Sequence, residues 1–245
     1  MPTAADFTDP YLGTFTPVPP VASDVCNLCH GAPNPGWARC LSCTTTLRQV
    51  SRPITRVVPV TLCAEWGPVH NLLRGYKDGP EELKARFLPR VAALLARFVD
   101  EHGKCVGDWE TVTAVPSSKG RPGRHPLVRA IGMVSSLASH YEELLVPGAR
   151  PARHLAASDH AFEVTTRLDG RRVLLVDDTF TSGAELQSAA SALKLAGASI
   201  PAAVVIGRFI RPGFNEAAHS LWQRASDREF TFERCCLCDP PWPEG

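Results

Sequence analysis

The four aliphatic residues at positions 173–176, VLLV, constrain the fold of this chain more than any other stretch. An apolar run without polar alternation is typical of a strand with both faces covered, as in the parallel sheet of an α/β protein. A segment with helical spacing follows, because Leu186, Ala189, Ala190 and Leu193 fall on one face. The sequence therefore predicts a buried strand followed closely by a helix.

Two carboxylates and a hydroxyl-rich turn lie between this strand and this helix. Asp177 and Asp178 end the strand, and residues 179–183, TFTSG, form the turn. Small and hydroxylated residues at the start of a helix present unpaired N–H groups and the positive end of the helix dipole, which favour a bound phosphate. Carboxylates would repel that phosphate unless they bound sugar hydroxyls or a metal ion. A ribose 5-phosphate would suit both features, because its phosphate would bind at the turn and its hydroxyls would donate to the carboxylates.

Two other phosphate-binding patterns do not occur: there is no G-x-x-x-x-G-K-[ST], and no G-x-G-x-x-G follows a strand-like run. Residues 173–184, VLLVDDTFTSGA, instead resemble the phosphoribosyl-pyrophosphate (PRPP) motif of the type I phosphoribosyltransferases. In that family the acidic pair holds the ribose 2′- and 3′-hydroxyls and the loop holds the 5′-phosphate. The resemblance assigns PRPP binding to Asp177, Asp178, Thr179, Phe180, Thr181, Ser182 and Gly183.

Two C-x2-C pairs near the N-terminus predict a zinc site. Cys26 and Cys29 are separated by ten residues from Cys40 and Cys43. Four thiolates at such spacing are typical ligands of a structural, tetrahedral Zn²⁺ ion. His30 could replace one of them, but the paired spacing favours the four cysteines.

A third C-x2-C pair complicates this assignment. Cys235 and Cys238 lie near the C-terminus, so six cysteines compete for sites that need four ligands each. The alternative is that the tail folds back to complete or extend the N-terminal site. Cys63 and Cys105 have no partner at ligand spacing and are interpreted as ordinary buried thiols.

The composition is that of a globular protein with one substantial α/β domain and a small module: 245 residues, 44% hydrophobic and 21% charged. The formal net charge of +1 gives no overall reason to expect nucleic-acid or membrane binding. The N-terminus lacks a signal-peptide pattern, and no run approaches the ~18 apolar residues of a membrane span. We therefore expect a cytoplasmic protein without membrane insertion, in which nine cysteines favour metal binding over disulfides.

The motifs divide the chain into four parts. Residues 1–24, rich in proline and polar side chains, predict a disordered or loosely docked leader. Residues 25–55 form the zinc module, residues 56–234 the phosphoribosyltransferase-like domain, and residues 235–245 a Cys- and Pro-rich tail.

Within the main domain the pattern predicts a strand near residues 57–60, a short helix over 69–79, and an amphipathic helix over 82–100 that Pro89 kinks or splits. Residues 127–145 are also helical by pattern, and residues 200–206 predict another buried strand.

A four-cysteine module, the helix sequence LLRGYK at residues 72–77 and the PRPP motif together resemble the ComF family of competence-related phosphoribosyltransferase homologues. Lys77 stands at that family's lysine position. It could reach a phosphate or a substrate carboxylate as a point charge, or it could be a solvated surface lysine.

A basic loop follows the strand-like residues 111–115. It carries Lys119, Arg121, Arg124, His125 and Arg129, and loops at the carboxyl end of parallel strands bind ligands in open α/β sheets. The resemblance makes Ser117, Ser118 and Lys119 the pyrophosphate loop; the alternative is a solubilising basic loop. Residues 122–126, PGRHP, depart from the family's R-G-F-N-Q-type run, which puts its substrate contacts in doubt.

The resemblance implies the type I phosphoribosyltransferase fold, a parallel sheet with helices on both faces, which would bind PRPP with Mg²⁺. It implies transfer of a phosphoribosyl group to an unidentified acceptor with release of pyrophosphate. A short loop at residues 147–169 would close over the site. The alternative is a non-catalytic PRPP- or nucleotide-binding protein that acts in DNA uptake through single-stranded DNA or protein partners. The few charges in the zinc module favour a structural zinc over a DNA-binding finger.

Overall fold

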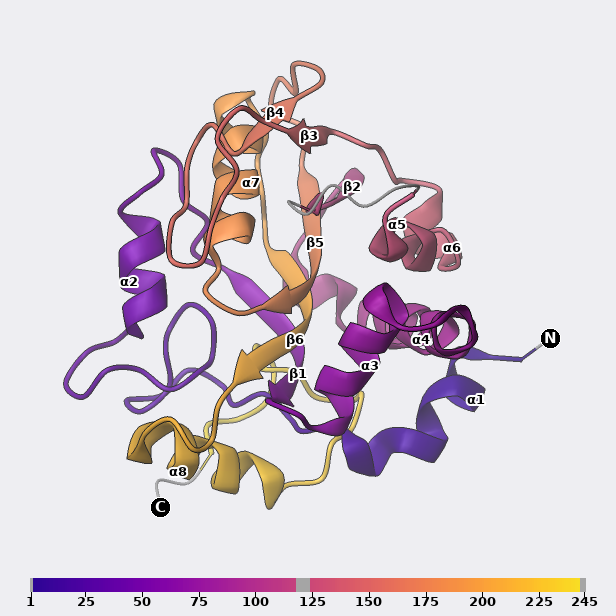
Figure 1. Cartoon of the computed structure of the whole chain (residues 1–245), viewed down its shortest axis with the longest axis vertical. Helices are drawn as coiled ribbons and strands as arrows, with labels where there is room; N and C mark the ends of the chain where they lie inside the picture. Colours follow the sequence, from indigo (N-terminus) through magenta and orange to yellow (C-terminus); the bar gives the residue numbers. More distant parts are fainter. Residues whose placement is uncertain (1, 118–123, 243–245) are drawn as a thin grey trace.

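Four parallel strands form the central sheet, in the order β1-β6-β5-β2 (Figure 1). The computed structural model describes residues 2–117 and 124–242. The strands are β1 (Val57–Ala64), β2 (Thr111–Ala114), β5 (Val173–Phe180) and β6 (Ala203–Ile210). The expected parallel α/β sheet is therefore confirmed.

The aliphatic run lies in β5, which has a neighbour on both sides and is buried from Val173 to Val176. β5 is longer than the predicted strand, because its pairing with β6 continues to Thr179↔Gly207 and Phe180↔Arg208. Thr179 and Phe180 thus belong to the strand and not to the turn. The apolar pattern stops at Asp177, so composition could not reveal this extension.

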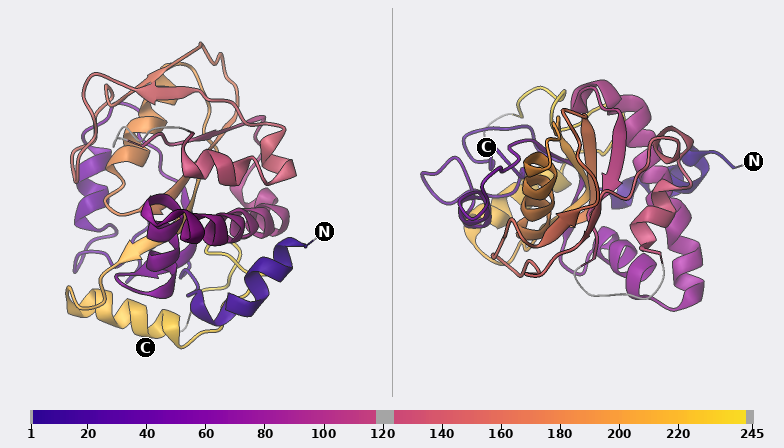
Figure 2. Two further views of the ribbon diagram at one scale, coloured as in Figure 1. Left: turned by 45° about the vertical axis from the view of Figure 1, so that its right-hand side comes forward. Right: turned by 90° about the horizontal axis from the view of Figure 1, so that it is seen from above.

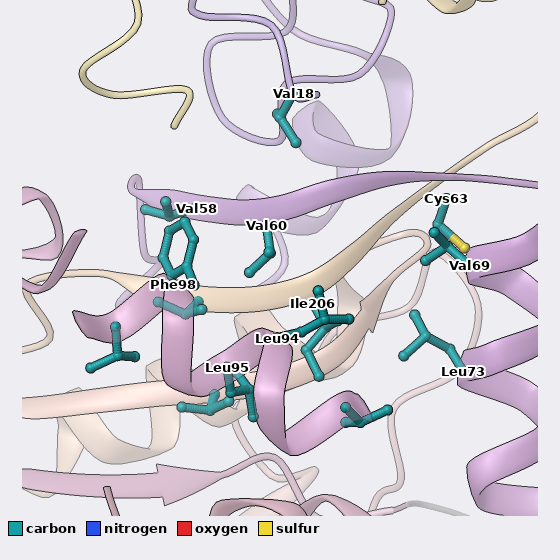
Figure 3. Packing of buried hydrophobic residues seen from close by; sticks show 14 of the residues in the cluster. Val18, Val58, Val60, Cys63, Val69, Leu73, Leu94, Leu95, Phe98 and Ile206 are labelled. Atoms are coloured by element: carbon teal, nitrogen blue, oxygen red, sulfur yellow. The ribbon is translucent and has the colours of Figure 1, made fainter. Parts of the chain in front are cut away.

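Alternate residues of the strands pack into two apolar clusters on opposite faces of the sheet. One face is covered by α3 (Pro68–Asp78), α4 (Glu81–Val106) and α5 (Pro126–Ile131), and the other by α7 (Ala184–Leu195) (Figure 2). Figure 3 shows α4 residues Leu94, Leu95 and Phe98 facing the strands β1 and β6. Helices cover both faces, as expected.

α4 is a single helix through Pro89 and extends six residues beyond the predicted end at 100. The predicted helix over 127–145 is wrong: it is replaced by α5, α6 (Ser135–Ala138) and the start of β3 (Leu145–Pro147). β3 pairs antiparallel with β4 (Phe162–Val164), so the expected loop at 147–169 begins and ends in a small sheet. α2 (Leu41–Leu47) and α8 (Glu216–Ser226) complete the named elements.

The leader, expected to be disordered or loosely docked, contains two short helices that lie against the main domain. It forms α1 (Ala4–Thr8) and the 3-10 helix η1 (Asp9–Thr14), and α1 packs on α4. Thr16 then bridges β1, accepting a hydrogen bond from the N–H of Leu62 at 2.9 Å. The leader thereby covers part of the exposed edge of β1, which explains why a segment without apolar periodicity is held in place. No helix among the described residues is long and apolar enough to cross a membrane.

Candidate functional site

A cavity of 480 Å³ lies where β5 ends. It is lined by residues at the carboxyl ends of β5 and β6, by residues that follow β2, and by one side of α3. A second hollow of 440 Å³ adjoins it, since Asp177, Thr179, Thr181 and Glu185 line both. The carboxyl edge of a parallel sheet is the usual ligand position in open α/β folds.

Asp178 is held by two donors from α3. The hydroxyl of Tyr76 donates to Oδ2 at 2.5 Å, and Nζ of Lys77 donates to Oδ1 at 2.7 Å. Burial alone would raise the pKa of Asp178, but the charge and hydrogen bond of Lys77 outweigh burial and lower that pKa. Asp178 is therefore an ionised carboxylate with protein partners on both oxygens.

Asp177 is half-buried and lines both hollows. Its Oδ1 accepts a hydrogen bond from the N–H of Asp178 at 2.8 Å. Burial and then the negative charge of Asp178 raise the pKa of Asp177 well above its usual range. Both carboxylates of the motif line the 480 Å³ cavity, but they are inequivalent: Asp178 is buried and paired with α3, whereas Asp177 is half-buried and also lines the second hollow.

The turn after β5 depends on Gly183, which precedes α7 and has φ +78°. A Cβ at this position would lie 2.4 Å from Cζ of Phe180, so both the backbone and the close ring require glycine. Ser182 is buried, and its Oγ accepts from the N–H groups of Ala184 and Leu155, each at 3.4 Å. The turn opens on the N-terminus of a twelve-residue helix, which attracts anions.

Cationic side chains line the other side of the 480 Å³ cavity. Lys77 lies there with its side chain 18% exposed, so it belongs to the cavity and is not a solvated surface lysine. The cations Arg74 and Arg211 also line it, together with the imidazole of His125. Of the predicted pyrophosphate loop, Ser117 lines the cavity, whereas Ser118 and Lys119 lie outside the described residues.

The segment between β3 and β4 borders the second hollow through Arg153 and His154. Asp159 anchors this segment, because its carboxylate accepts from the hydroxyls of Ser51 at 2.5 Å and Ser191 at 2.6 Å. The predicted lid segment thus contacts the turn and α7 in this structure.

Cys26, Cys29, Cys40 and Cys43 form a buried cluster whose sulfurs lie within 4.8 Å of one another, as predicted. The sulfurs of Cys29 and Cys40 are 3.8 Å apart, and Cys40 N–H donates to the sulfur of Cys26 at 3.4 Å. Such a set could hold a metal ion such as zinc. His30 is outside it, because Nδ1 contacts the carbonyl of Pro19 at 2.8 Å.

Arg208 connects this cluster to the turn after β5. Its Nη1 donates to the carbonyls of Phe180 at 3.2 Å and Thr181 at 3.4 Å, and the guanidinium lies 5.1 Å from the Phe180 ring centre. Burial alone would lower the pKa of Arg208, but the negative charge of Cys29 and its neighbours raises it. Gly31 allows this approach, since a Cβ there would lie 2.6 Å from Nη2 of Arg208. Sequence reasoning did not anticipate Arg208, because a lone arginine in a strand carries no pattern.

The interpretation of Cys105 as an isolated thiol is wrong, and so is the alternative that the tail completes the N-terminal cluster. Cys105 lies with His102, Cys235 and Cys238 in a second group whose ligand atoms are within 4.8 Å of one another. The H-x2-C spacing on α4 was the available signal.

No known family model matches this chain, and no curated protein matches its sequence significantly.

Proposed function

We propose that this chain is a PRPP-binding, phosphoribosyltransferase-like protein of the ComF type. The observation that carries the proposal is the position of Asp177. It lies between a turn that opens a helix and a cavity wall bearing Lys77, Arg74 and Arg211. A ligand with a phosphate at one end, sugar hydroxyls in the middle and a pyrophosphate at the other matches this order of groups.

The 5′-phosphate would bind at residues 181–184, where a glycine turn meets the N-terminus of α7. A ribose hydroxyl would donate to Asp177, the carboxylate that lines both hollows. The pyrophosphate would lie against Lys77 and the other cations of the wall, with Mg²⁺ as its counter-ion. Asp178 would act by fixing Lys77 in place, a role that differs from direct ribose contact.

Transfer in this site would break the bond between ribose C1 and the pyrophosphate oxygen and form a bond from C1 to a nitrogen of the acceptor. The protein's contribution would be to hold the two reactants in line and to stabilise the charge on the leaving pyrophosphate. The cations of the cavity wall supply that charge stabilisation. No acid–base side chain is assigned.

The N-terminal cysteine cluster would hold a structural Zn²⁺ ion, because four buried thiolates leave no open coordination position. Through Arg208 the same cluster would support the carbonyls of Phe180 and Thr181. We place the protein in the cytoplasm, where reducing conditions keep thiols available for zinc.

A second candidate is PRPP or nucleotide binding without transfer, in DNA uptake with single-stranded DNA or a protein as partner. One feature favours it: Asp178 is buried and already accepts from Tyr76 and Lys77, so it has fewer acceptor sites left and the ribose hydroxyls would depend more on Asp177. A weakly held ribose would bind without being aligned for transfer.

Calorimetric titration with Mg²⁺-PRPP tests the proposal, using wild type, Asp177→Asn and, as a control, Asp169→Asn on an exposed turn. At a pH above the raised pKa of Asp177, we expect binding that Asp177→Asn weakens by at least about tenfold, since a hydrogen bond to a charged group contributes ~1.5–3 kcal/mol. Pyrophosphate release with candidate base acceptors then separates transfer from binding alone. No heat of binding at millimolar PRPP would overturn the proposal.

A further inference from the structure

A second group of metal-ligand side chains lies at the far end of α4 and joins two segments that are distant in sequence. His102 and Cys105 are one helical turn apart near the C-terminus of α4, and Cys235 and Cys238 come from the tail. Residues three apart on a helix share a face, so the imidazole and the thiol point the same way. Each of the four side chains offers one ligand atom, and these four atoms lie within 4.8 Å of one another.

The separations match a tetrahedron around one ion. Nδ1 of His102 lies 3.7 Å from the sulfur of Cys238 and 3.9 Å from that of Cys105, and the sulfurs of Cys235 and Cys238 are 3.5 Å apart. Zinc–sulfur and zinc–nitrogen bond lengths predict ligand edges of about 3.8 Å for two sulfurs and about 3.5 Å for sulfur and nitrogen. A disulfide requires about 2.05 Å, so these cysteines are not bonded to each other.

Neighbouring groups hold the His102 ring and the tail cysteines in place. His102 is 3% exposed, and the Phe98 ring lies against it with centroids 5.1 Å apart. The N–H of Cys235 donates to the sulfur of Cys238 at 3.3 Å, and the carbonyl of Cys235 accepts from the N–H of Cys238 at 3.1 Å. The tail pair is therefore held in a tight turn, with Cys238 exposed at its outer side.

We infer that His102, Cys105, Cys235 and Cys238 form a second zinc site, separate from the N-terminal cluster. Three thiols and one imidazole suit Zn²⁺, and four protein ligands leave no position for a substrate, so the site is structural. The ion would fasten the tail to α4.

Residues 227–242, which follow α8 and include the two tail cysteines, are all described and contain no helix or strand. They nevertheless carry aromatic rings into the core: Phe230 meets Phe15 of the leader at 5.3 Å, and Arg97 of α4 lies 4.1 Å from the Phe232 ring centre. A metal cross-link that closes a long chain segment would offset the entropy lost in ordering this tail. The leader packs on the Phe230 ring through Phe15, so its position would also depend on this metal ion.

Elemental analysis of the full chain, purified without added metal, tests the inference. We expect two zinc ions per chain, one for each group of ligands. Cys105→Ser/Cys238→Ser should lower the content to one, and Cys26→Ser/Cys29→Ser should do the same. Cys63→Ala is the matched control: Cys63 is buried and, among the described residues, belongs to neither group, so this variant should keep both ions.

X-ray absorption at the zinc edge of the wild type gives a test that needs no variant to fold. Two occupied sites would present seven sulfurs and one imidazole nitrogen. The spectrum should therefore show a nitrogen contribution beside a dominant sulfur shell. One zinc per chain with sulfur ligands alone would overturn the inference, as would a Cys105→Ser/Cys238→Ser variant that folds and retains both ions.

Discussion

Nζ of Lys77 lies 2.7 Å from Oδ1 of Asp178, and this ion pair joins α3 to the end of β5. The two side chains are 18% and 7% exposed, so the pair is largely withdrawn from water. Asp178 is kept ionised, and Lys77 is kept at the wall of the cavity. The pair therefore has consequences for both stability and ligand binding.

Lys77→Met should lower the free energy of unfolding by about 2 kcal/mol, because it leaves a buried carboxylate without its cation. It should also weaken Mg²⁺-PRPP binding by roughly tenfold or more, since a charged contact to the pyrophosphate is lost. Urea denaturation and calorimetry measure the two effects.

Lys84→Met is the control for this variant. Lys84 pairs with Glu81 at 2.8 Å across one turn of α4, at the surface and away from the cavity. Its replacement should change stability by no more than about 0.5 kcal/mol. Equal effects of the two substitutions would contradict the role given to Lys77.

Under the proposed function, the raised pKa of Asp177 would make PRPP binding depend on pH. Below that pKa the carboxyl group carries a proton and is a poor acceptor, so affinity should increase as the pH rises through the raised value. The free energy of unfolding should decrease as the pH rises over this range. The reason is that the native state retains a proton on Asp177 that the unfolded chain has already released. Asp177→Asn should show only the pH dependence of the ligand's own phosphates. A wild-type profile parallel to that of Asp177→Asn would count against the assignment.

Gly183→Ala should destabilise the protein by more than about 1 kcal/mol and weaken PRPP binding, because it adds both backbone strain and a collision with Phe180. Gly170→Ala separates the two effects. Gly170 has a similar φ of +85°, but a Cβ there meets nothing within 4 Å. Thermal denaturation of both variants should show the larger loss for Gly183→Ala; a larger loss for Gly170→Ala would mean that the turn tolerates a Cβ.

Arg208→Lys should weaken PRPP binding while leaving the zinc content unchanged. The lysine keeps the positive charge near the cysteine cluster but lacks the planar guanidinium whose Nη1 donates to the carbonyls of Phe180 and Thr181. Zinc analysis and calorimetry on the same preparation provide the comparison, with Arg167→Lys on the exposed surface as control. Loss of zinc from Arg208→Lys, with PRPP binding intact, would contradict this coupling.

Sequence reasoning predicted those parts of the fold in which local pattern and burial agree. The run at residues 173–176 is a central strand, and the paired spacing of Cys26, Cys29, Cys40 and Cys43 predicted one buried cluster. Pro89 did not split α4, because the helix around it is buried against the sheet and tertiary packing outweighs the local cost of proline.

The remaining features depend on contacts between distant segments. The leader packs against the edge of β1 and against α4, and the sequence of residues 1–24 does not reveal these contacts. Cys105 finds its partners 130 residues further along the chain, at Cys235, so spacing rules could not connect them. Likewise, Asp177 and Asp178 are adjacent and of the same type, so the sequence does not distinguish them. Their inequivalence arises from Tyr76 and Lys77 on α3, which donate to Asp178.

A crystal structure of the protein with Mg²⁺-PRPP tests the central claim most directly. The account predicts the 5′-phosphate at the backbone N–H groups of residues 181–184, the ribose against Asp177, and the pyrophosphate beside Lys77. Density for PRPP at another surface, with this cavity empty at saturating ligand, would contradict it.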